Sequence, residues 1–227
     1  SLKSLETAGF ISQQQKAKLP IARNELHFDL ELNDQQQNIV ENVWKKKDQF
    51  QPFLLEGITG SGKTEVYIEL TERVLKDNQQ VLILIPEIGL TSQFVDRFKK
   101  RLNTTIVILN SSVSDKERKQ AWLLAKAGLA HVIIGTRSAV FTPLSQPGLI
   151  IIDEEHDSSY KQQDGLRYHA RNVALIRAQK YDIPIVIGSA TPSLESLYQV
   201  KKERFELLEL TQRAGSAQLP KVRLVDC

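Results

Sequence analysis

Residues 57–64 read Gly57-Ile58-Thr59-Gly60-Ser61-Gly62-Lys63-Thr64, between a short apolar run and a helical pattern. They match the phosphate-loop pattern G-x-x-x-x-G-K-[ST] in full, in the strand-to-helix setting that the pattern requires. The glycines let successive backbone amides point at phosphate oxygens, and the following helix adds its dipole. The pattern predicts a nucleotide triphosphate site. The alternative is a glycine-rich turn that carries Lys and Thr by chance.

Two side chains of this loop have predicted roles. Lys63 would reach the β and γ phosphates, and the hydroxyl of Thr64 would ligate magnesium. The expected cofactors are therefore ATP and Mg²⁺. The loop alone indicates nucleotide binding and does not choose among the many classes of protein that use it.

Around the loop, apolar runs alternate with amphipathic helical patterns. This alternation predicts an α/β fold with a parallel sheet covered by helices on both faces. Ligands in such sheets bind at the carboxyl ends of the strands. The expected strands lie at 53–55, 81–85, 105–109, 131–134, 149–152 and 185–187, and the expected helices at 33–44, 66–74, 94–102, 116–126, 171–179 and 194–200.

Composition narrows the class of protein. Of 227 residues, 41% are hydrophobic and 25% charged, as in an ordinary soluble globular protein. A single cysteine, Cys227, excludes an internal disulfide framework and a thiol-bound zinc. No apolar run is long enough to span a bilayer, so we expect a cytoplasmic protein without a membrane partner. Methionine is absent, so we expect a piece cut from a longer protein.

A second motif closes the apolar run 149–152. Asp153 and Glu154 follow it directly, so the strand delivers two carboxylates to the binding edge of the sheet. Asp153 would hold magnesium, and Glu154 would orient and deprotonate the attacking water. The alternative is a solvated acidic turn, which is common when such a pair occurs alone.

A third motif, Gly188-Ser189-Ala190-Thr191-Pro192, ends another apolar strand. D-E-x-H at 153–156 followed by S-A-T resembles the superfamily 2 helicases. The resemblance implies that His156 and the pair Ser189 and Thr191 link the nucleotide site to a DNA-binding face, and it adds His156 to the catalytic set. The alternative for Thr191 is a helix cap before Pro192.

The resemblance becomes narrower over 86–91, 135–141, 153–178 and 188–196. With these strings, the chain from Leu32 onward is similar to the primosomal replication-restart DNA helicases. The resemblance implies a P-loop NTPase RecA-like first lobe at 31–227, preceded at 1–30 by a winged-helix remnant and linker.

The activity implied by this resemblance is that of an ATP-dependent 3′-to-5′ DNA helicase in the restart of stalled replication forks. The implied partners are single-stranded and forked DNA, single-strand DNA-binding protein and other primosome proteins, at the bacterial nucleoid. Zinc is expected in the second lobe of the intact protein only. Because that lobe supplies an arginine finger, we expect this piece to bind nucleotide but to hydrolyse ATP poorly. The alternatives are the first lobe of another superfamily 2 DNA translocase, and a nucleic-acid-binding module with a vestigial nucleotide site.

Further residues are implied to face ligands. Gln36 lies where such helicases place an adenine-reading glutamine, although Gln35 and Gln37 leave the register open. The segment 157–171 interleaves aromatic and cationic side chains suited to single strands, but Leu166 and Asn172 depart from the family pattern. The alternatives are a surface loop and ordinary helix capping. The implied DNA contacts are Thr91, Thr136, Arg137, Ser138, Tyr160, Lys161, Arg167, Tyr168, His169 and Arg171.

Overall fold

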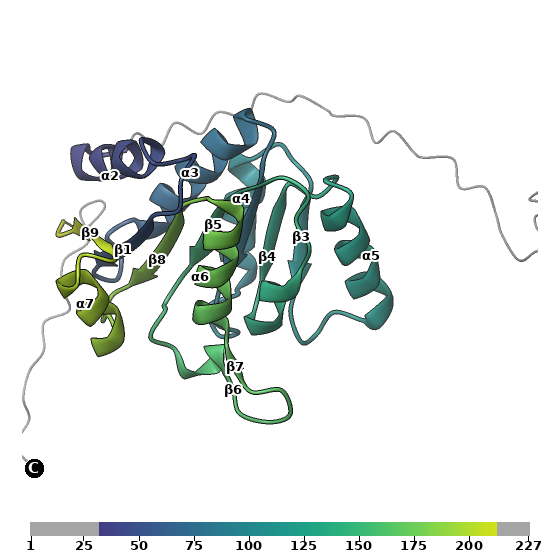
Figure 1. Cartoon of the computed structure of the whole chain (residues 1–227). Helices are drawn as coiled ribbons and strands as arrows, with labels where there is room; N and C mark the ends of the chain where they lie inside the picture. The colour runs from purple at the N-terminus through teal and green to yellow at the C-terminus, as the bar shows by residue number, and fades with distance from the viewer. Residues whose placement is uncertain (1–31, 213–227) are drawn as a thin grey trace, which may run out of the picture.

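Seven strands lie side by side in the computed structural model, which describes residues 32–212 (Figure 1). Their order is β3-β4-β2-β5-β8-β1-β9, and each pair is parallel. The α/β parallel sheet predicted from the alternation is confirmed. The strands are β1 (Pro52–Gly57), β2 (Gln80–Leu84), β3 (Ile106–Leu109), β4 (Val132–Gly135), β5 (Pro147–Ile152), β8 (Ile185–Ser189) and β9 (Glu206–Leu210).

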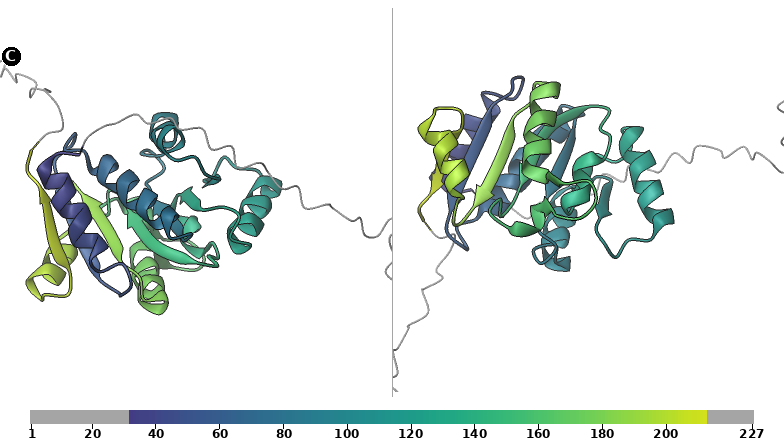
Figure 2. Two further views of the ribbon diagram at one scale, coloured as in Figure 1. Left: turned by 90° about the horizontal axis from the view of Figure 1, so that it is seen from above. Right: turned by 60° about the horizontal axis from the view of Figure 1, so that its bottom comes forward.

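Helices cover both faces of the sheet (Figure 2). One face packs against α2 (Asp34–Trp44), α3 (Lys63–Lys76) and α4 (Ser92–Arg101). The other packs against α5 (Asp115–Lys126), α6 (Ala170–Tyr181) and α7 (Leu194–Lys201). Because the interior strands are buried on both faces, they read as continuous apolar runs rather than alternating ones.

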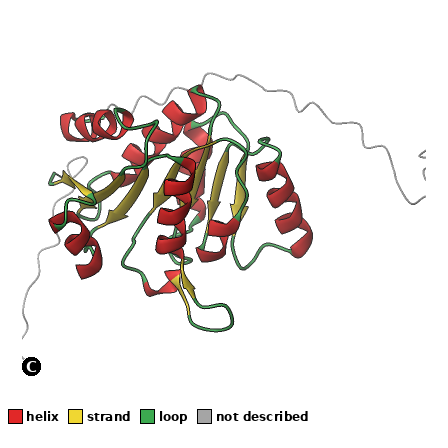
Figure 3. Cartoon of the chain, in the orientation of Figure 1, coloured by secondary structure: helices red, strands yellow, loops and turns green. Residues whose placement is uncertain are grey.

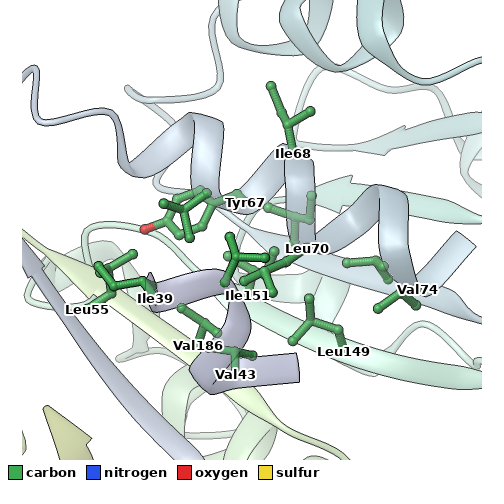
Figure 4. Packing of buried hydrophobic residues seen from close by; sticks show 14 of the residues in the cluster. Ile39, Val43, Leu55, Tyr67, Ile68, Leu70, Val74, Leu149, Ile151 and Val186 are labelled. Carbon is green, nitrogen blue, oxygen red and sulfur yellow. The ribbon is translucent and has the colours of Figure 1, made fainter. Parts of the chain in front are cut away.

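The first of these two cores is built by interdigitation of α2 and α3 with the strands (Figure 4). Ile39 and Val43 from α2 lie with Leu70 from α3 over Ile151 and Val186 of the sheet, and all five are buried. Burying apolar side chains of this size stabilises a fold by about 1.5–3 kcal/mol each.

Local signals explain where several helices begin. Asn33 forms a capping box with Gln36 at α2, and Ser114 forms another with Glu117 at α5. Thr91 accepts a hydrogen bond from the backbone of Phe94 and so caps α4.

The structure adds elements that the sequence patterns did not predict. These are the edge strand β9, the short helices η1 (Arg137–Phe141) and η2 (Ser158–Tyr160), and a hairpin of β6 (Lys161–Gln162) and β7 (Tyr168–His169). Figure 3 shows the hairpin projecting away from the sheet. β9 is half exposed, so it lacks the continuous apolar run of a central strand.

The two predicted domains are only partly covered by the residues that the structure describes. The winged-helix remnant and linker at 1–30 lie outside residues 32–212, as do the last residues of the predicted lobe. Within 32–212, no helix combines the length and apolarity needed to cross a bilayer.

Strand order brings the three motifs together. β5, β8 and β1 are neighbours in the sheet, and all three run in the same direction. The acidic pair follows β5, the Ser189 motif ends β8, and the phosphate loop follows β1. The three motifs therefore meet at one edge of the sheet.

Candidate nucleotide-binding site

The phosphate loop lines one side of a cavity of about 640 Å³, and Asp153 and Glu154 line another part of it. The loop needs its glycines, since Gly60 and Gly62 have φ angles of 81° and 88°. A side chain at Gly57 would place its Cβ 2.6 Å from the hydroxyl of Ser61. The two predicted motifs thus face one shared space.

Lys63 is held inside this cavity. Its side chain is 9% exposed, and its Nζ lies 3.6 Å from Oε1 of Glu154. The ammonium also donates to the backbone oxygen of Gly57 over 2.8 Å. The Ser61 hydroxyl is buried without a hydrogen-bond partner among the described residues. A phosphate group fits this loop, because it would add an acceptor beside the buried donors.

Asp153 is fixed by two tyrosines. Tyr67 donates to its Oδ1 over 2.9 Å, and Tyr160 donates to its backbone oxygen over 2.7 Å. Burial raises the pKa of Asp153, as does the negative charge of Glu154, while the Tyr67 hydrogen bond and the charge of Lys63 oppose the rise. Burial also raises the pKa of both tyrosines well above the usual range. Their hydroxyls therefore remain protonated donors.

Glu154 has a left-handed backbone with a φ angle of 46°. For a residue with a side chain, that conformation costs on the order of 1–3 kcal/mol and persists when surrounding structure enforces it. It turns the carboxylate toward Lys63 and toward His156, whose Nδ1 is 3.7 Å from Oε2 of Glu154.

Thr64 and Asp153 are the candidate magnesium ligands, and both line the cavity. Magnesium in such sites takes one or two protein oxygens together with phosphate oxygens and water. The hydroxyl of Thr64 and the carboxylate of Asp153 match this mode of coordination. Over residues 32–212 there is no group of three or more His, Cys, Asp or Glu that would form an all-protein metal cage.

Among the three consecutive glutamines at 35–37, Gln36 is the one that lines the cavity. It is buried at 3% exposure. Its Oε1 accepts from the backbone of Asn33, and its Nε2 lies 3.4 Å from the backbone oxygens of Ser61 and Gly62. Its neighbours point elsewhere, because Gln35 donates to Thr211 and Gln37 donates to Glu41.

His156, Ser189 and Thr191 come together as the resemblance implied. Nδ1 of His156 is 2.8 Å from Oγ of Ser189, and its Nε2 is 3.5 Å from Oγ1 of Thr191. The amide of Thr191 donates to Oγ of Ser189 over 3.0 Å. The capping alternative for Thr191 is wrong, since Ser193 caps α7. The trio connects the end of β8 to the acidic turn after β5.

The structure contradicts the implied DNA contact at Tyr160. Its side chain is 0% exposed and belongs to the core beneath the sheet edge. A ring with no exposed surface cannot stack on a base without unpacking that core. Its hydroxyl instead supports Asp153.

The structure also contradicts the implied DNA contact at Arg171. Its side chain is 13% exposed and pairs with Glu155, whose side chain is 0% exposed. Nη1 of Arg171 also donates to the hydroxyls of Ser193 and Ser196 over 2.8 and 3.0 Å. This guanidinium neutralises a buried acid rather than facing a nucleic acid backbone.

The hairpin keeps the other predicted side chains at the surface. Lys161 and Arg167 are exposed, and with Tyr168 and His169 they line a cavity of about 560 Å³. His169 accepts the backbone N–H of Arg171 and caps α6. Leu166 is 77% exposed on the hairpin.

The remaining predicted DNA contacts lie where helices begin after strands: Thr91 and Thr136 stand at the N-caps of α4 and η1, and Arg137 and Ser138 lie within η1. Thr91 is exposed and caps α4, as the capping alternative required. Thr136 precedes η1 without a side-chain cap bond, and Ser138 is exposed. Nη1 of Arg137 donates to the backbone oxygens of Ser159 and Lys161 over 3.0 and 3.2 Å. Arg137 thereby ties η1 to the base of the hairpin.

Sequence reasoning missed several residues of the site. Tyr67 reads as one more apolar position on a helix, and no pattern indicates that its hydroxyl faces Asp153. Glu65 is buried beside the phosphate loop and pairs with Arg97, which lines the cavity. A buried charge so close to the loop depends on the packing of α4 against α3, which sequence spacing does not reveal.

Residues 33–200 match the family model for DEAD/DEAH box helicases. That match covers the phosphate loop, the acidic turn, the hairpin and the Ser189 motif, so it spans most of the chain. This chain belongs to the DEAD/DEAH box helicases.

Within that class, the chain is similar to replication restart protein PriA. It is 53% identical to the protein of Haemophilus influenzae over 74% of this chain and 23% of the relative. It is 43% identical to that of Bacillus subtilis over 87% and 25%, and 40% identical to that of Chlamydia trachomatis over 100% and 31%. The chain thus spans about a quarter of the length of these relatives.

Solved helicase structures have the same fold. RecG bound to a three-way DNA junction superposes with a TM-score of 0.62 at 19% identity, over 83% of this chain and 25% of that one. The UvsW helicase from bacteriophage T4 gives 0.54 at 18% identity, over 92% and 67%. With the parallel sheet, this confirms the predicted α/β RecA-like fold.

Proposed function

We propose that this lobe binds ATP with Mg²⁺ and forms half of the motor of a longer DNA helicase that acts in replication restart. One observation carries the proposal: the phosphate loop and the carboxylates of Asp153 and Glu154 line the same cavity. The similarity to PriA over most of the chain supports the process in which the motor would act.

Each residue of the cavity would have a distinct task. Lys63 would neutralise phosphate charge, and Gln36 would face the adenine. Thr64 and Asp153 would hold magnesium, which when bound supplies a positive charge beside the phosphates. Glu154 would accept a proton from the attacking water. Tyr67 would keep Asp153 in position from below.

The trio of His156, Ser189 and Thr191 would carry the state of the cavity to the DNA-facing loops. Its hydrogen bonds join the turn that holds Glu154 to the loop that precedes α7. Thr91, Thr136 and Ser138 remain proposed DNA contacts, as do the exposed hairpin residues Lys161 and Arg167 and the half-buried Tyr168 and His169. Arg137 would brace the hairpin. Backbone contacts of this kind position a strand without reading its sequence.

Finer expectations from the resemblance belong to the same proposal. They are 3′-to-5′ movement on single-stranded or forked DNA, partnership with single-strand DNA-binding protein and other primosome proteins, a site of action at the bacterial nucleoid, and zinc in a second lobe. We also propose that the chain by itself hydrolyses ATP slowly. An arginine finger supplied across a domain interface accelerates related reactions by roughly 10³–10⁵-fold.

The test is equilibrium binding of a fluorescent ATP analogue to the 227-residue chain with and without Mg²⁺. Lys63→Ala should weaken binding by roughly 10- to 100-fold, because it removes a charge-assisted hydrogen bond worth about 1.5–3 kcal/mol. Lys76→Ala, an exposed lysine at the end of the same helix, is the matched control and should bind as the wild type. Magnesium-independent binding, or equal affinity for Lys63→Ala, would favour a nucleic-acid-binding module with a vestigial site.

A steady-state ATPase assay tests the slow turnover. Strong DNA-stimulated hydrolysis by the isolated chain would contradict the need for a second lobe.

A further inference from the structure

A small cavity of about 110 Å³ lies beside the edge strand β3, between α5 and η1. Two aromatic side chains line it, and both are half in solvent: Trp122 is 41% exposed and Phe141 is 50% exposed. Arg118 and Ser138 complete its rim. Exposed apolar surface rimmed by polar residues is a feature of binding sites, and tryptophan is enriched at interfaces.

The cavity is joined to the hairpin by aromatic contact. Phe141 and Tyr168 meet edge to face with ring centroids 4.9 Å apart. Tyr168 in turn lines the hairpin cavity together with Lys161 and Arg167. The three aromatic residues therefore form a row from α5 across η1 to the hairpin.

Positive charge accompanies this row. Arg118 is exposed, and its Nη2 makes long hydrogen bonds of 3.4 Å to the backbone oxygens of Asn110 and Val113. Lys126 lies 5.3 Å from the centroid of the Trp122 ring. The first turn of α5 carries two acids, Asp115 and Glu117, and Glu117 accepts hydrogen bonds from the backbone and hydroxyl of Ser114.

We propose that Trp122 and Phe141 bind one unstacked base of a DNA single strand, while Arg118 contacts an adjacent phosphate. This extends the proposed DNA-facing hairpin by a separate stacking site, so it rests on the proposed function that the chain binds DNA. Aromatic faces interleaved with cations suit single strands, since every base has a π face and every nucleotide a negative charge. The cavity is on the scale of one planar ring, which is small for a docked peptide segment.

The sequence offers a direct reporter for this site. The chain has two tryptophans, Trp44 and Trp122. Trp44 lies on α2 beneath the cations of Lys47 and Arg73, whose charged groups are 4.9 and 5.9 Å from its ring centroid. The variant Trp44→Phe leaves Trp122 as the sole fluorophore, and Trp122→Phe leaves Trp44.

The experiment titrates both single-tryptophan chains, and the unchanged chain, with oligo(dT) at low salt. The proposal expects fluorescence quenching in Trp44→Phe at the concentrations at which a labelled oligonucleotide binds, and no quenching in Trp122→Phe. The variant Trp122→Ala should weaken oligo(dT) binding by about 5- to 160-fold, the range expected for the loss of a base-stacking side chain. Leu123→Ala, which removes a neighbouring side chain that is 50% exposed, is the matched control and should change nothing.

Several results would overturn this proposal. One is oligo(dT) binding that leaves the Trp122 signal and the Trp122→Ala affinity unchanged, with Lys161 or Arg167 substitutions weakening it. Another is no binding of oligo(dT) at low salt. A response of Trp122 to apolar peptides but not to DNA would assign the surface to a protein partner instead. A thermal melt of Trp122→Ala matching that of the wild type excludes misfolding as the cause.

Failure here is distinguishable from failure of the proposed nucleotide site. ATP-analogue binding depends on Lys63, and it should be the same in Trp122→Ala as in the wild type.

Discussion

Arg171→Met should destabilise the fold by about 3 kcal/mol, because it leaves Glu155 buried without its counter-ion. Removing one partner of a buried ion pair costs roughly 3–5 kcal/mol. Glu155 would retain three hydrogen bonds, from the amide and hydroxyl of Ser193 over 2.7 and 3.1 Å and from the hydroxyl of Ser196 over 3.0 Å. These remaining donors place the expected loss at the lower end of the range.

The measurement is urea unfolding of the 227-residue chain followed by circular dichroism, with a thermal melt in parallel. A loss of this size lowers Tm by about 6–12 °C in a domain of this length. Arg167→Met is the matched control, since Arg167 is an exposed hairpin arginine. Its stability should stay within about 0.5 kcal/mol of the wild type, while its oligonucleotide affinity should fall.

A double-mutant cycle separates the ion pair from general packing. Glu155→Gln combined with Arg171→Met should recover part of the lost stability, with a coupling energy of at least about 1 kcal/mol. The reasoning is refuted if Arg171→Met costs less than about 1 kcal/mol. It is equally refuted if the variant is stable but binds DNA weakly, because Arg171 would then be a DNA contact after all.

Three further predictions concern backbone space, strain and protonation. Gly188→Ala would place a Cβ 1.8 Å from the hydroxyl of Tyr67, so it should cost about 1–3 kcal/mol in urea unfolding and weaken ATP-analogue binding. Adding Tyr67→Phe should restore part of that stability, and no restoration would contradict the clash. Glu154→Asn should raise the unfolding free energy by up to about 1 kcal/mol, because Asn adopts the left-handed backbone more easily. Glu203→Asn is the comparison, because Glu203 has a φ of 55° but does not line the nucleotide cavity. It should give a similar gain in stability in a thermal melt. A lower Tm in both variants would contradict the idea that the left-handed backbone is strained at these two positions. Burial, and then the charge of the neighbouring arginine, lower the pKa of His169, so its contribution to stability is complete above a pH of about 6.5 and is lost as the pH falls through the lowered pKa. His169→Asn should therefore lose less stability than the wild type between pH values of about 7.5 and 5.5, and equal losses in urea titrations at the two pH values would exclude this role.

Much of the site follows from patterns that are local in sequence. The phosphate loop, the acidic end of β5 and the Ser189 motif each combine a buried strand with the polar residues directly after it. Because the carboxyl ends of parallel strands all lie at one edge of the sheet, the residues that follow neighbouring strands lie near one another. The helices also follow from local chemistry, as the capping boxes at Asn33 and Ser114 illustrate.

Packing over long sequence distances decided the rest. Tyr160 and Arg171 belong to a segment rich in aromatic and cationic residues, yet one lies in the core and the other neutralises Glu155. Lys161 and Arg167, from the same segment, remain at the surface. Whether such a side chain faces solvent depends on which strand or helix, distant in sequence, packs over it. The residue types of the segment do not indicate that packing.

The same limit applies to Gln36 and Tyr67. Three consecutive glutamines look equivalent along the chain, and only the docking of α2 beside the phosphate loop selects the middle one. Tyr67 becomes a support for Asp153 because β5 lies beneath α3, although the two residues are 86 positions apart in the sequence. Local spacing sets the period and ends of each element, whereas burial and hydrogen-bond partners come from contacts between elements that the chain brings together only on folding.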